Sequence, residues 1–143
     1  MSFLIPKKRL VIVEEECTLN NALKASGNEK LKEQGHIFIL NNKQELTGIL
    51  TDGDIRRALV NYGKDLLAKK IKDLSNEKYI FLDELAKPKI MISRINQMQI
   101  KHNKHGIKLI PLIDKEKKLI SAVCFQSLLN EQITNISSVS IIG

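Results

Sequence analysis

Five residues at one corner of the chain have the types and the spacing that anion binding requires. They follow an apolar run and lead into an amphipathic stretch, and they are Thr51, Gly53, Asp54, Arg56 and Arg57. A helix that begins here would expose unpaired N–H groups and the positive end of its dipole, and both favour phosphate. Glycine lets the backbone approach a ligand closely, and arginines form charge-assisted hydrogen bonds with phosphate. The corner therefore indicates a site for a phosphate-bearing molecule.

Helix capping is an alternative explanation of the Thr51 and Asp54 spacing that needs no ligand. The pattern T-x-x-D before an apolar run is also a helix capping box, in which Thr51 and Asp54 bond each other's backbone N–H groups. Capping does not account for Arg56 and Arg57, because a cation in the first helical turn is unfavourable by a few tenths to about 1 kcal/mol. The two arginines favour an anion or an acidic partner, and capping stays open as the alternative.

Metal binding and catalysis have little support in the sequence. Asp52 and Asp54 form a D-x-D pair, but no third carboxylate or histidine stands near them. His102 and His105 have i, i+3 spacing where a helix is expected to end, so capping or solvent exposure explains them better than a metal does. The chain has no P-loop, G-x-G-x-x-G, G-x-S-x-G or H-E-x-x-H motif and no nucleophile–base constellation. We expect no metal, no cofactor and no catalytic residue.

The composition describes a basic chain whose charge is dispersed. Its 143 residues carry 23 Lys and Arg against 16 Asp and Glu, a formal net charge of +7, and only 4% are aromatic. Nucleic-acid-binding proteins usually gather cations on one face and interleave aromatics, whereas these lysines are spread along the chain. We therefore expect no nucleic-acid partner, although the charge would concentrate an anionic metabolite.

The sequence predicts neither export nor membrane insertion. It has no run of about eighteen apolar residues, and its first residues lack the pattern of a secretory signal. Cys17 and Cys124 lie far apart and form no C-x-x-C pair, so we expect reduced, structural thiols, with a disulfide as the alternative. We expect the protein in the cytoplasm.

The elements that must position the corner follow the same order in both halves of the chain. Short apolar runs predict strands, and periodic stretches predict helices. In the first half the predicted elements are strand 10–13, helix 19–26, strand 36–40, strand 46–50 and helix 55–61. In the second half they are strand 79–82, helix 88–102, strand 108–113, strand 119–125 and helix 127–132. Each half is thus β-α-β-β-α.

The two halves also match in register. The segment 38–55 aligns with 111–128 without gaps, with apolar residues and turns at the same positions. Neither half alone would bury enough surface to fold. We therefore predict one α/β domain, more narrowly α+β, of two units related by a pseudo-twofold axis. The predicted boundaries are unit 1 at 8–69, unit 2 at 70–135 and a tail at 136–143.

Two motifs give the chain a family resemblance. Gly48–Asp54 has the pattern G-x-x-T-x-x-D, and Gly106–Asp114, GIKLIPLID, is similar to the strand motif G-I-x-x-L-P-V-V-D. Over roughly residues 8–135 the sequence resembles a tandem pair of CBS domains, a Bateman module. The resemblance implies two units packed sheet to sheet. It also implies that the Asp at the position of Asp54 binds the ribose hydroxyls of a nucleotide and that the Thr at the position of Thr51 contacts ribose or phosphate.

The longer string TDGDIRRAL narrows the resemblance. It resembles the CBS pairs attached to arabinose-5-phosphate isomerases and sugar-1-phosphate nucleotidyltransferases. The implied function is a non-catalytic regulatory module that binds an adenosine or cytidine nucleotide, such as AMP, ATP or a CMP-sugar, and modulates an attached or partner enzyme. The alternative is a structural dimerisation module without a ligand. We expect a homodimer, which the apolar stretch Ile90–Ile100 would support.

The second half lacks the chemistry of the first corner. The alignment of the two halves puts Cys124 at the position of Thr51 and Ser127 at that of Asp54, and neither arginine has a cationic counterpart. We expect Ser127 to cap the following helix. We expect at most one nucleotide per chain, because the second corner should bind none.

The tail ends in an apolar run. Val139–Gly143 predicts a strand because it is rich in β-branched residues and ends in glycine. Two hypotheses follow: it is the first strand of a following nucleotide-binding domain, or it closes this one.

Overall fold

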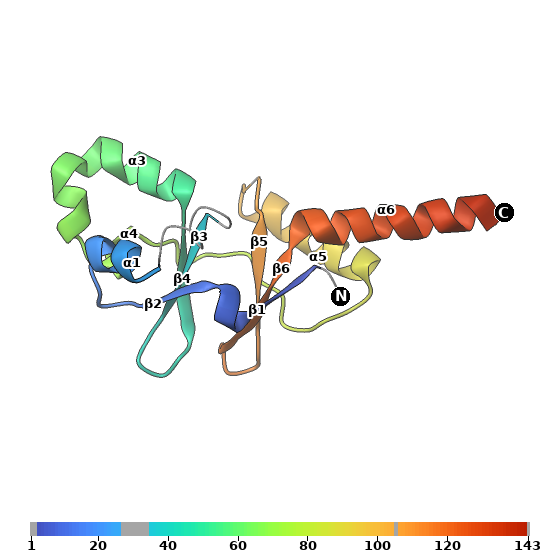
Figure 1. The fold of residues 1–143 in the computed structure, drawn as a ribbon, viewed down its shortest axis with the longest axis horizontal. Coiled ribbons are helices and arrows are strands. Elements are labelled where there is room, and N and C mark those ends of the chain that lie inside the picture. Colours follow the sequence, from blue (N-terminus) through green and yellow to red (C-terminus); the bar gives the residue numbers. More distant parts are fainter. Residues whose placement is uncertain (1–2, 27–34, 105, 143) are drawn as a thin grey trace.

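Two three-stranded sheets lie at the centre of the molecule. The computed structural model describes residues 3–26, 35–104 and 106–142. The first sheet has the order β2 (Val11–Glu14), β3 (His36–Leu40), β4 (Leu46–Thr51), and the second has the order β1 (Leu4–Pro6), β6 (Leu119–Cys124), β5 (Leu109–Ile113). Among these strands β2 and β3 pair in parallel and the other neighbours are antiparallel. Figure 1 shows the sheets side by side with helices at both ends, which confirms the predicted fold class.

The helices lie close to where the sequence predicts them, with differences at their ends. In the described residues they are α1 (Leu19–Ser26), α3 (Asp52–Tyr62), α4 (Ile71–Leu74), α5 (Pro88–Lys101) and α6 (Phe125–Ile142), with 3-10 turns η1 (Lys7–Arg9) and η2 (Gly63–Ala68). The predicted bounds of α1 are confirmed, and α5 begins at the predicted Pro88 but ends at Lys101, with His102 as its C-cap. The prediction for α3 is corrected: it begins at Asp52 rather than Ile55, because Thr51 is its N-cap. It ends at Gly63, whose φ of 57° suits glycine.

The buried apolar side chains form three clusters, one of which lies between the sheets. Strands of both sheets and adjoining residues contribute to this central cluster, which contains Leu10, Phe38, Leu40, Leu46, Ile49, Leu109, Ile113, Leu119 and Ala122. The other two clusters pack the first sheet against α1, η2 and α4, and the second sheet against α5 and α6. The predicted sheet-to-sheet packing is therefore confirmed, since each sheet buries one face against the other and one against helices.

The predicted strand at 79–82 is wrong, since the structure has a single bridge there. Leu82 donates its N–H to the carbonyl of Pro111 and accepts from the N–H of Ile113, both at 2.9 Å. The next bond of a parallel ladder would need an N–H from Pro111, and proline has none. The segment therefore runs beside β5 with Ile80 and Leu82 buried, but it pairs with that strand only once.

The predicted strand at the end of the chain is also wrong. The helix α6 continues to Ile142, and no glycine or proline interrupts it after Phe125. A helix without such breakers continues through β-branched residues, whose lower helix propensity costs only a few tenths of a kcal/mol each. In Figure 1 the far half of α6 extends away from both sheets. Gly143 lies outside the described residues.

The first strand of the chain belongs to the second sheet. β1 pairs with β6, with Leu4 opposite Val123, and the Cys124 N–H donates to the Phe3 carbonyl at 2.7 Å. The chain then passes through η1 and enters the first sheet as β2. The chain therefore passes from the second sheet into the first between β1 and β2, and it returns to the second sheet after β4.

Both cysteines are free, so the disulfide alternative is not realised. Burial, aided by the negative charge of Glu14, raises the pKa of the Cys17 thiol and favours its protonated form. Among the described residues, no helix combines the length and the apolar character that crossing a bilayer needs.

Candidate ligand-binding site

The corner begins where the β3–β4 pair ends. Thr51, the last residue of β4, lies opposite His36, and the Asp52 N–H donates to the Gly35 carbonyl at 3.0 Å. The chain then turns directly into α3. The end of the first sheet therefore fixes the position of the first helical turn and its N–H groups.

Gly48, the glycine of the G-x-x-T-x-x-D pattern, lies where the segment that connects the two halves packs against β4. Ile49 exchanges N–H···O bonds with Asn76 at 3.3 and 3.1 Å, so the segment that connects the two halves lies against the strand. A Cβ at Gly48 would lie 2.6 Å from the Ser75 hydroxyl oxygen. Gly48 is thus required for the close approach of this segment.

Thr51 and Asp54 form a complete capping box. The Asp54 N–H donates to the Thr51 hydroxyl at 3.2 Å, and Oδ2 of Asp54 accepts from the N–H and the hydroxyl of Thr51, both at 2.9 Å. Helix capping, one of the two explanations of the sequence pattern, is therefore present in the structure. It fixes the Asp54 carboxylate in one orientation.

Arg57 has an acidic partner in the preceding turn of α3. Its Nη2 donates to Oδ1 of Asp54 at 2.6 Å, and its guanidinium lies over Gly53, where a Cβ would be 3.3 Å from Nη1. Because α3 begins at Asp52, Arg57 is its sixth residue and lies beyond the first turn, where the sequence had placed it; its unfavourable interaction with the helix dipole is therefore weaker than expected, and Asp54 offsets it within the chain. Arg57 alone no longer argues for an external anion.

Asp54 is a charged acceptor at neutral pH. Partial burial is the largest single effect and raises its pKa, but the hydrogen bonds from Thr51 and the bond and charge of Arg57 together outweigh it. The pKa of Asp54 is therefore lowered from its usual value. The carboxylate stays ionised although its side chain is only 23% exposed.

A cleft opens in front of the corner, and residues of both halves line it. Its outer part, about 290 Å³, has Gly35, 51–54 and Arg57 on one side and Lys104 and 106–108 on the other. Its inner part, about 40 Å³, is more apolar and is lined by Ile49, Tyr79, Ile80, Ile107 and Leu109 beside the polar residues. His36, Thr51, Asp54, Lys104 and Ile107 line both parts, so the two form one cleft.

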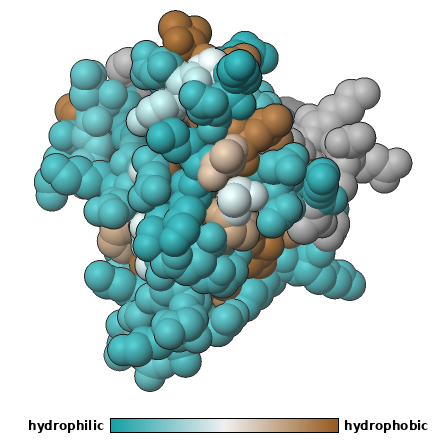
Figure 2. Space-filling model, turned by 90° about the vertical axis from the view of Figure 1, so that its left-hand side faces the viewer, coloured by the Kyte–Doolittle hydropathy of each residue, from teal (hydrophilic) through white to brown (hydrophobic). Residues whose placement is uncertain are grey.

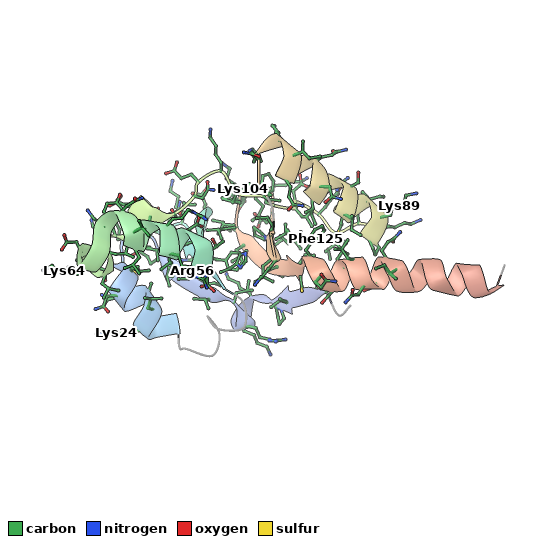
Figure 3. The ribbon with its side chains drawn as sticks, turned by 90° about the horizontal axis from the view of Figure 1, so that it is seen from above. Lys24, Arg56, Lys64, Lys89, Lys104 and Phe125 are labelled. Atoms are coloured by element: carbon green, nitrogen blue, oxygen red, sulfur yellow. The ribbon has the colours of Figure 1, made fainter. Side chains whose placement is uncertain are left out.

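The structure brings four of the five predicted site residues to this cleft. Thr51, Gly53, Asp54 and Arg57 line its outer part. Arg56 is exposed on the same helix but does not belong to the lining, and Lys104 approaches from the segment that follows α5 (Figure 3). The predicted site is therefore a cluster of four, with Arg56 outside it.

Sequence reasoning missed three of the cleft residues. Tyr79 lies in the connecting segment, where its hydroxyl donates to the Leu46 carbonyl at 2.6 Å and burial raises its pKa. His36 is 5% exposed and lies beside Thr51. Neither these two nor Lys104 carried a sequence signal, and the motif that contains Ile107 was interpreted only as a strand.

The described residues contain no group of three His, Cys, Asp or Glu side chains that could hold a metal ion. The Asp52 carboxylate packs against Gly35, while that of Asp54 turns to Thr51, so the D-x-D pair does not converge. His105 lies outside the described residues.

A second pocket lies at the equivalent corner of the other half. It measures about 710 Å³ and is lined by Ile5, Arg9, 106–109 and 124–126. The expectation that Ser127 caps α6 is wrong: α6 begins at Phe125, so Cys124 precedes the helix and Ser127 is its third residue. The Ser127 hydroxyl donates to the Cys124 sulfur at 3.3 Å.

Comparison with known proteins gives matches that agree with this architecture. Residues 4–61 match the family model of the CBS domain. An uncharacterized protein of Chlamydia trachomatis serovar D is 29% identical over 86 residues, which are 59% of this chain. The chain spans about a quarter, 24%, of the length of that relative.

Solved structures match nearly the whole chain. CBSX2 in complex with AMP has a TM-score of 0.64 at 15% identity and covers 93% of this chain and 94% of its own. The cytosolic domain of the Mg²⁺ channel MgtE in complex with ATP has a TM-score of 0.63 at 17% identity, covering 90% of this chain and 46% of its own. CbpB of Listeria monocytogenes has a TM-score of 0.67 at 15% identity, covering 95% and 99%. Residues 4–61 therefore match the model of the CBS domain, and the chain as a whole has the fold of solved CBS-pair proteins.

Proposed function

We propose that the chain is a non-catalytic regulatory module that binds a nucleotide at the Asp54 corner. One observation carries the proposal: an ionised carboxylate at the N-terminus of α3 lies in a cleft whose opposite wall comes from the other half of the chain. Two solved structures of the same fold contain AMP and ATP, which supports the same class of ligand here.

The cleft offers a suitable group for each part of a nucleotide. The Asp54 carboxylate would accept bonds from the two ribose hydroxyls, and Thr51 would contact ribose or phosphate. The phosphate would meet the N–H groups of the first turn at Gly53, with Lys104 across the cleft. The base would lie toward the apolar inner part beside Ile107. Arg56, outside the lining, would contribute only its charge.

The size of the inner cleft suggests how binding would be signalled. Its volume of about 40 Å³ is small beside the roughly 290 Å³ of the outer part. A base that entered it would press against its walls, which belong to β4 on one side and to the start of β5 on the other. The ligand would thus prefer one relative arrangement of the two sheets, as a population shift requires.

We propose that the regulated protein is an attached or partner enzyme of cytoplasmic sugar-phosphate metabolism, a nucleotidyltransferase or an isomerase. The resemblance of TDGDIRRAL to the CBS pairs of those enzymes supports this assignment. The test is coexpression with candidate enzymes, followed by measurement of their activity with and without AMP. An activity that the module never changes would contradict the assignment.

We also propose a homodimer that forms through α5. Met91 and Ile95 face the core, whereas Ile90 and Ile100 on the same helix are 44% and 81% exposed. At the end of the molecule formed by α1 and α3, hydrophilic residues cover most of the surface and hydrophobic patches are small and separate (Figure 2). Sedimentation tests this assembly, and a 16.2 kDa particle at tens of micromolar would contradict it.

A structural module without a ligand is the second candidate. It is supported by the complete capping box and by the Asp54–Arg57 pair, which give the carboxylate partners in the absence of any ligand. Calorimetric titration with AMP, ATP and CMP separates the two candidates. We expect saturable binding of at least one of them, and no binding of any at millimolar concentration would favour the structural module.

A further inference from the structure

Both oxygens of the Asp54 carboxylate have donors within the chain. Oδ2 accepts from the N–H and the hydroxyl of Thr51, and Oδ1 accepts from Nη2 of Arg57 at 2.6 Å. The Thr51 bonds belong to the start of α3, so breaking them would open the helix. The Arg57 side chain, in contrast, is 72% exposed and projects from the next turn. Arg57 is thus the donor that can leave while the backbone stays in place.

A ribose would need the oxygen that Arg57 holds. An ionised carboxylate has about four acceptor sites, two on each oxygen. Thr51 fills both sites on Oδ2 and Arg57 fills one of the two on Oδ1, so a single site is left for two ribose hydroxyls and one existing donor has to leave. Arg57 must therefore move before Asp54 can bind both hydroxyls.

We propose that Arg57 is a specificity-determining residue, which covers Oδ1 of Asp54 in the ligand-free protein and exchanges that oxygen for the phosphate of an incoming nucleotide. The inference rests on the proposed function. A nucleoside that binds Asp54 breaks the Arg57–Asp54 ion pair, and it has no phosphate with which the guanidinium could pair instead. A nucleotide brings a phosphate to the first turn of α3 at Gly53, where the Arg57 guanidinium already lies and can bind it. The site would thus select nucleotides over nucleosides through one arginine.

The two interactions differ in strength. An exposed ion pair typically contributes a factor of about 1.5 to 5, whereas arginine bonds to phosphate are bidentate and among the strongest hydrogen bonds in proteins. Removing Arg57 should therefore weaken AMP binding by about tenfold or more. The same change should strengthen adenosine binding by up to about fivefold, because Oδ1 becomes free.

The test is calorimetric titration of AMP and adenosine into the whole chain as wild type, R57Q and R94Q. R94Q is a matched control, because the same substitution removes the pair between Arg94 of α5 and Glu84 of the segment before it, at 3.1 Å. We expect the ratio of AMP to adenosine affinity to fall at least about tenfold in R57Q. In R94Q it should stay within about twofold of the wild type.

Each other outcome has a definite meaning. If R57Q weakens both ligands equally, or changes neither, the exchange is wrong and the proposed function stands. If the wild type binds neither compound, the proposed function fails and the exchange fails with it. Should R57Q unfold, R57K keeps the charge but loses the bidentate geometry, and its ratio should lie between those of R57Q and the wild type; a wild-type ratio in R57K would overturn the proposal.

Discussion

The corner after β4 and the corner after β6 occupy equivalent positions in the two halves. α3 begins directly after Thr51 and α6 directly after Cys124, as the alignment of the two halves requires. The hairpins that lead into them also agree, since Gln44 and Lys117 have φ values of 67° and 65° at matching turn positions. The pairing register also shifts at the same place in both hairpins, between the last two residues of β3 and between the last two residues of β5. The backbone of the repeat is thus preserved down to its irregularities.

The side chains of the two corners differ in chemistry. The first corner has a complete capping box around a charged carboxylate, whereas at the second corner the Ser127 hydroxyl donates to the sulfur of Cys124. Gln126 stands where Gly53 leaves room for the guanidinium, and its side chain donates to Asn130 at 3.0 Å. This difference between the side chains of the two corners shows that the fold requires only a turn from strand to helix at these positions. A charged acceptor at a cleft is an addition that one half has and the other lacks.

The largest expected effect concerns the carboxylate itself. Asp54→Ala should weaken nucleotide binding by about 1.5–3 kcal/mol, the scale of hydrogen bonds to a charged group. Ser127→Ala at the matching position should leave affinity unchanged, and wild-type titrations should saturate at one nucleotide per chain. Calorimetry measures both quantities. Saturation at two equivalents, or equal effects of the two substitutions, would show that both corners bind.

The next effect concerns helix capping and needs no ligand. Thr51→Ala removes the oxygen that accepts from the Asp54 N–H and should destabilise the fold by about 1 kcal/mol, within a range of roughly 0.5–2. Cys124→Ala should cost less, because sulfur is a weak acceptor. Urea unfolding gives both free energies. Equal losses would mean that the second corner is capped as firmly as the first.

A smaller difference should appear in acid. The pKa of Asp54 is lowered in the folded protein, so its contribution to stability is complete above the unfolded pKa of about 3.9 and is lost as pH falls through the folded value. Ser127, at the matching position of the second corner, has no carboxyl group and adds no such dependence on pH. Unfolding midpoints of the wild type and D54N should therefore converge below about pH 4. A gap that stays constant from pH 7 to pH 3 would contradict the charged role of Asp54.

The smallest effect concerns the ion pair. Arg57→Gln should change the free energy of unfolding by less than about 1 kcal/mol, because the pair is partly exposed and salt screens it. Asn130→Ala, which removes the acceptor of Gln126 in the second corner, should be similar or smaller. Chemical unfolding at low and high salt provides the comparison. A loss well above 1 kcal/mol in R57Q alone would make Arg57 a structural residue.

Local patterns predicted most of the fold and most of the site. Alternation of apolar runs and turns predicted β3, β4, α1 and α5. The internal repeat predicted two similar units, and the family resemblance implied that they pack sheet to sheet. Two errors arose from backbone chemistry that a pattern of apolar residues does not contain. Pro111 withholds the N–H that a strand at 79–82 would need, and the absence of breakers lets α6 continue through a run that resembled a strand.

The missed parts of the site depend on long-range contacts. Lys104 and Tyr79 reach the cleft only because the two sheets pack against each other, and neither lies in a motif. The role of Arg57 was predicted as an anion contact, whereas its bond to Asp54 depends on a side-chain conformation that sequence spacing does not determine.

The position of β1 has a consequence for synthesis on the ribosome. The strand emerges first, but its partner β6 follows about 120 residues later, which at 5–20 residues per second takes on the order of ten seconds. Until then Leu4–Pro6 is an unpaired edge, while β2, β3 and β4 can already assemble. The second sheet is therefore the last to close, and it closes only when the two ends of the domain meet. Anything fused to the N-terminus would consequently act on the half of the molecule that is made last.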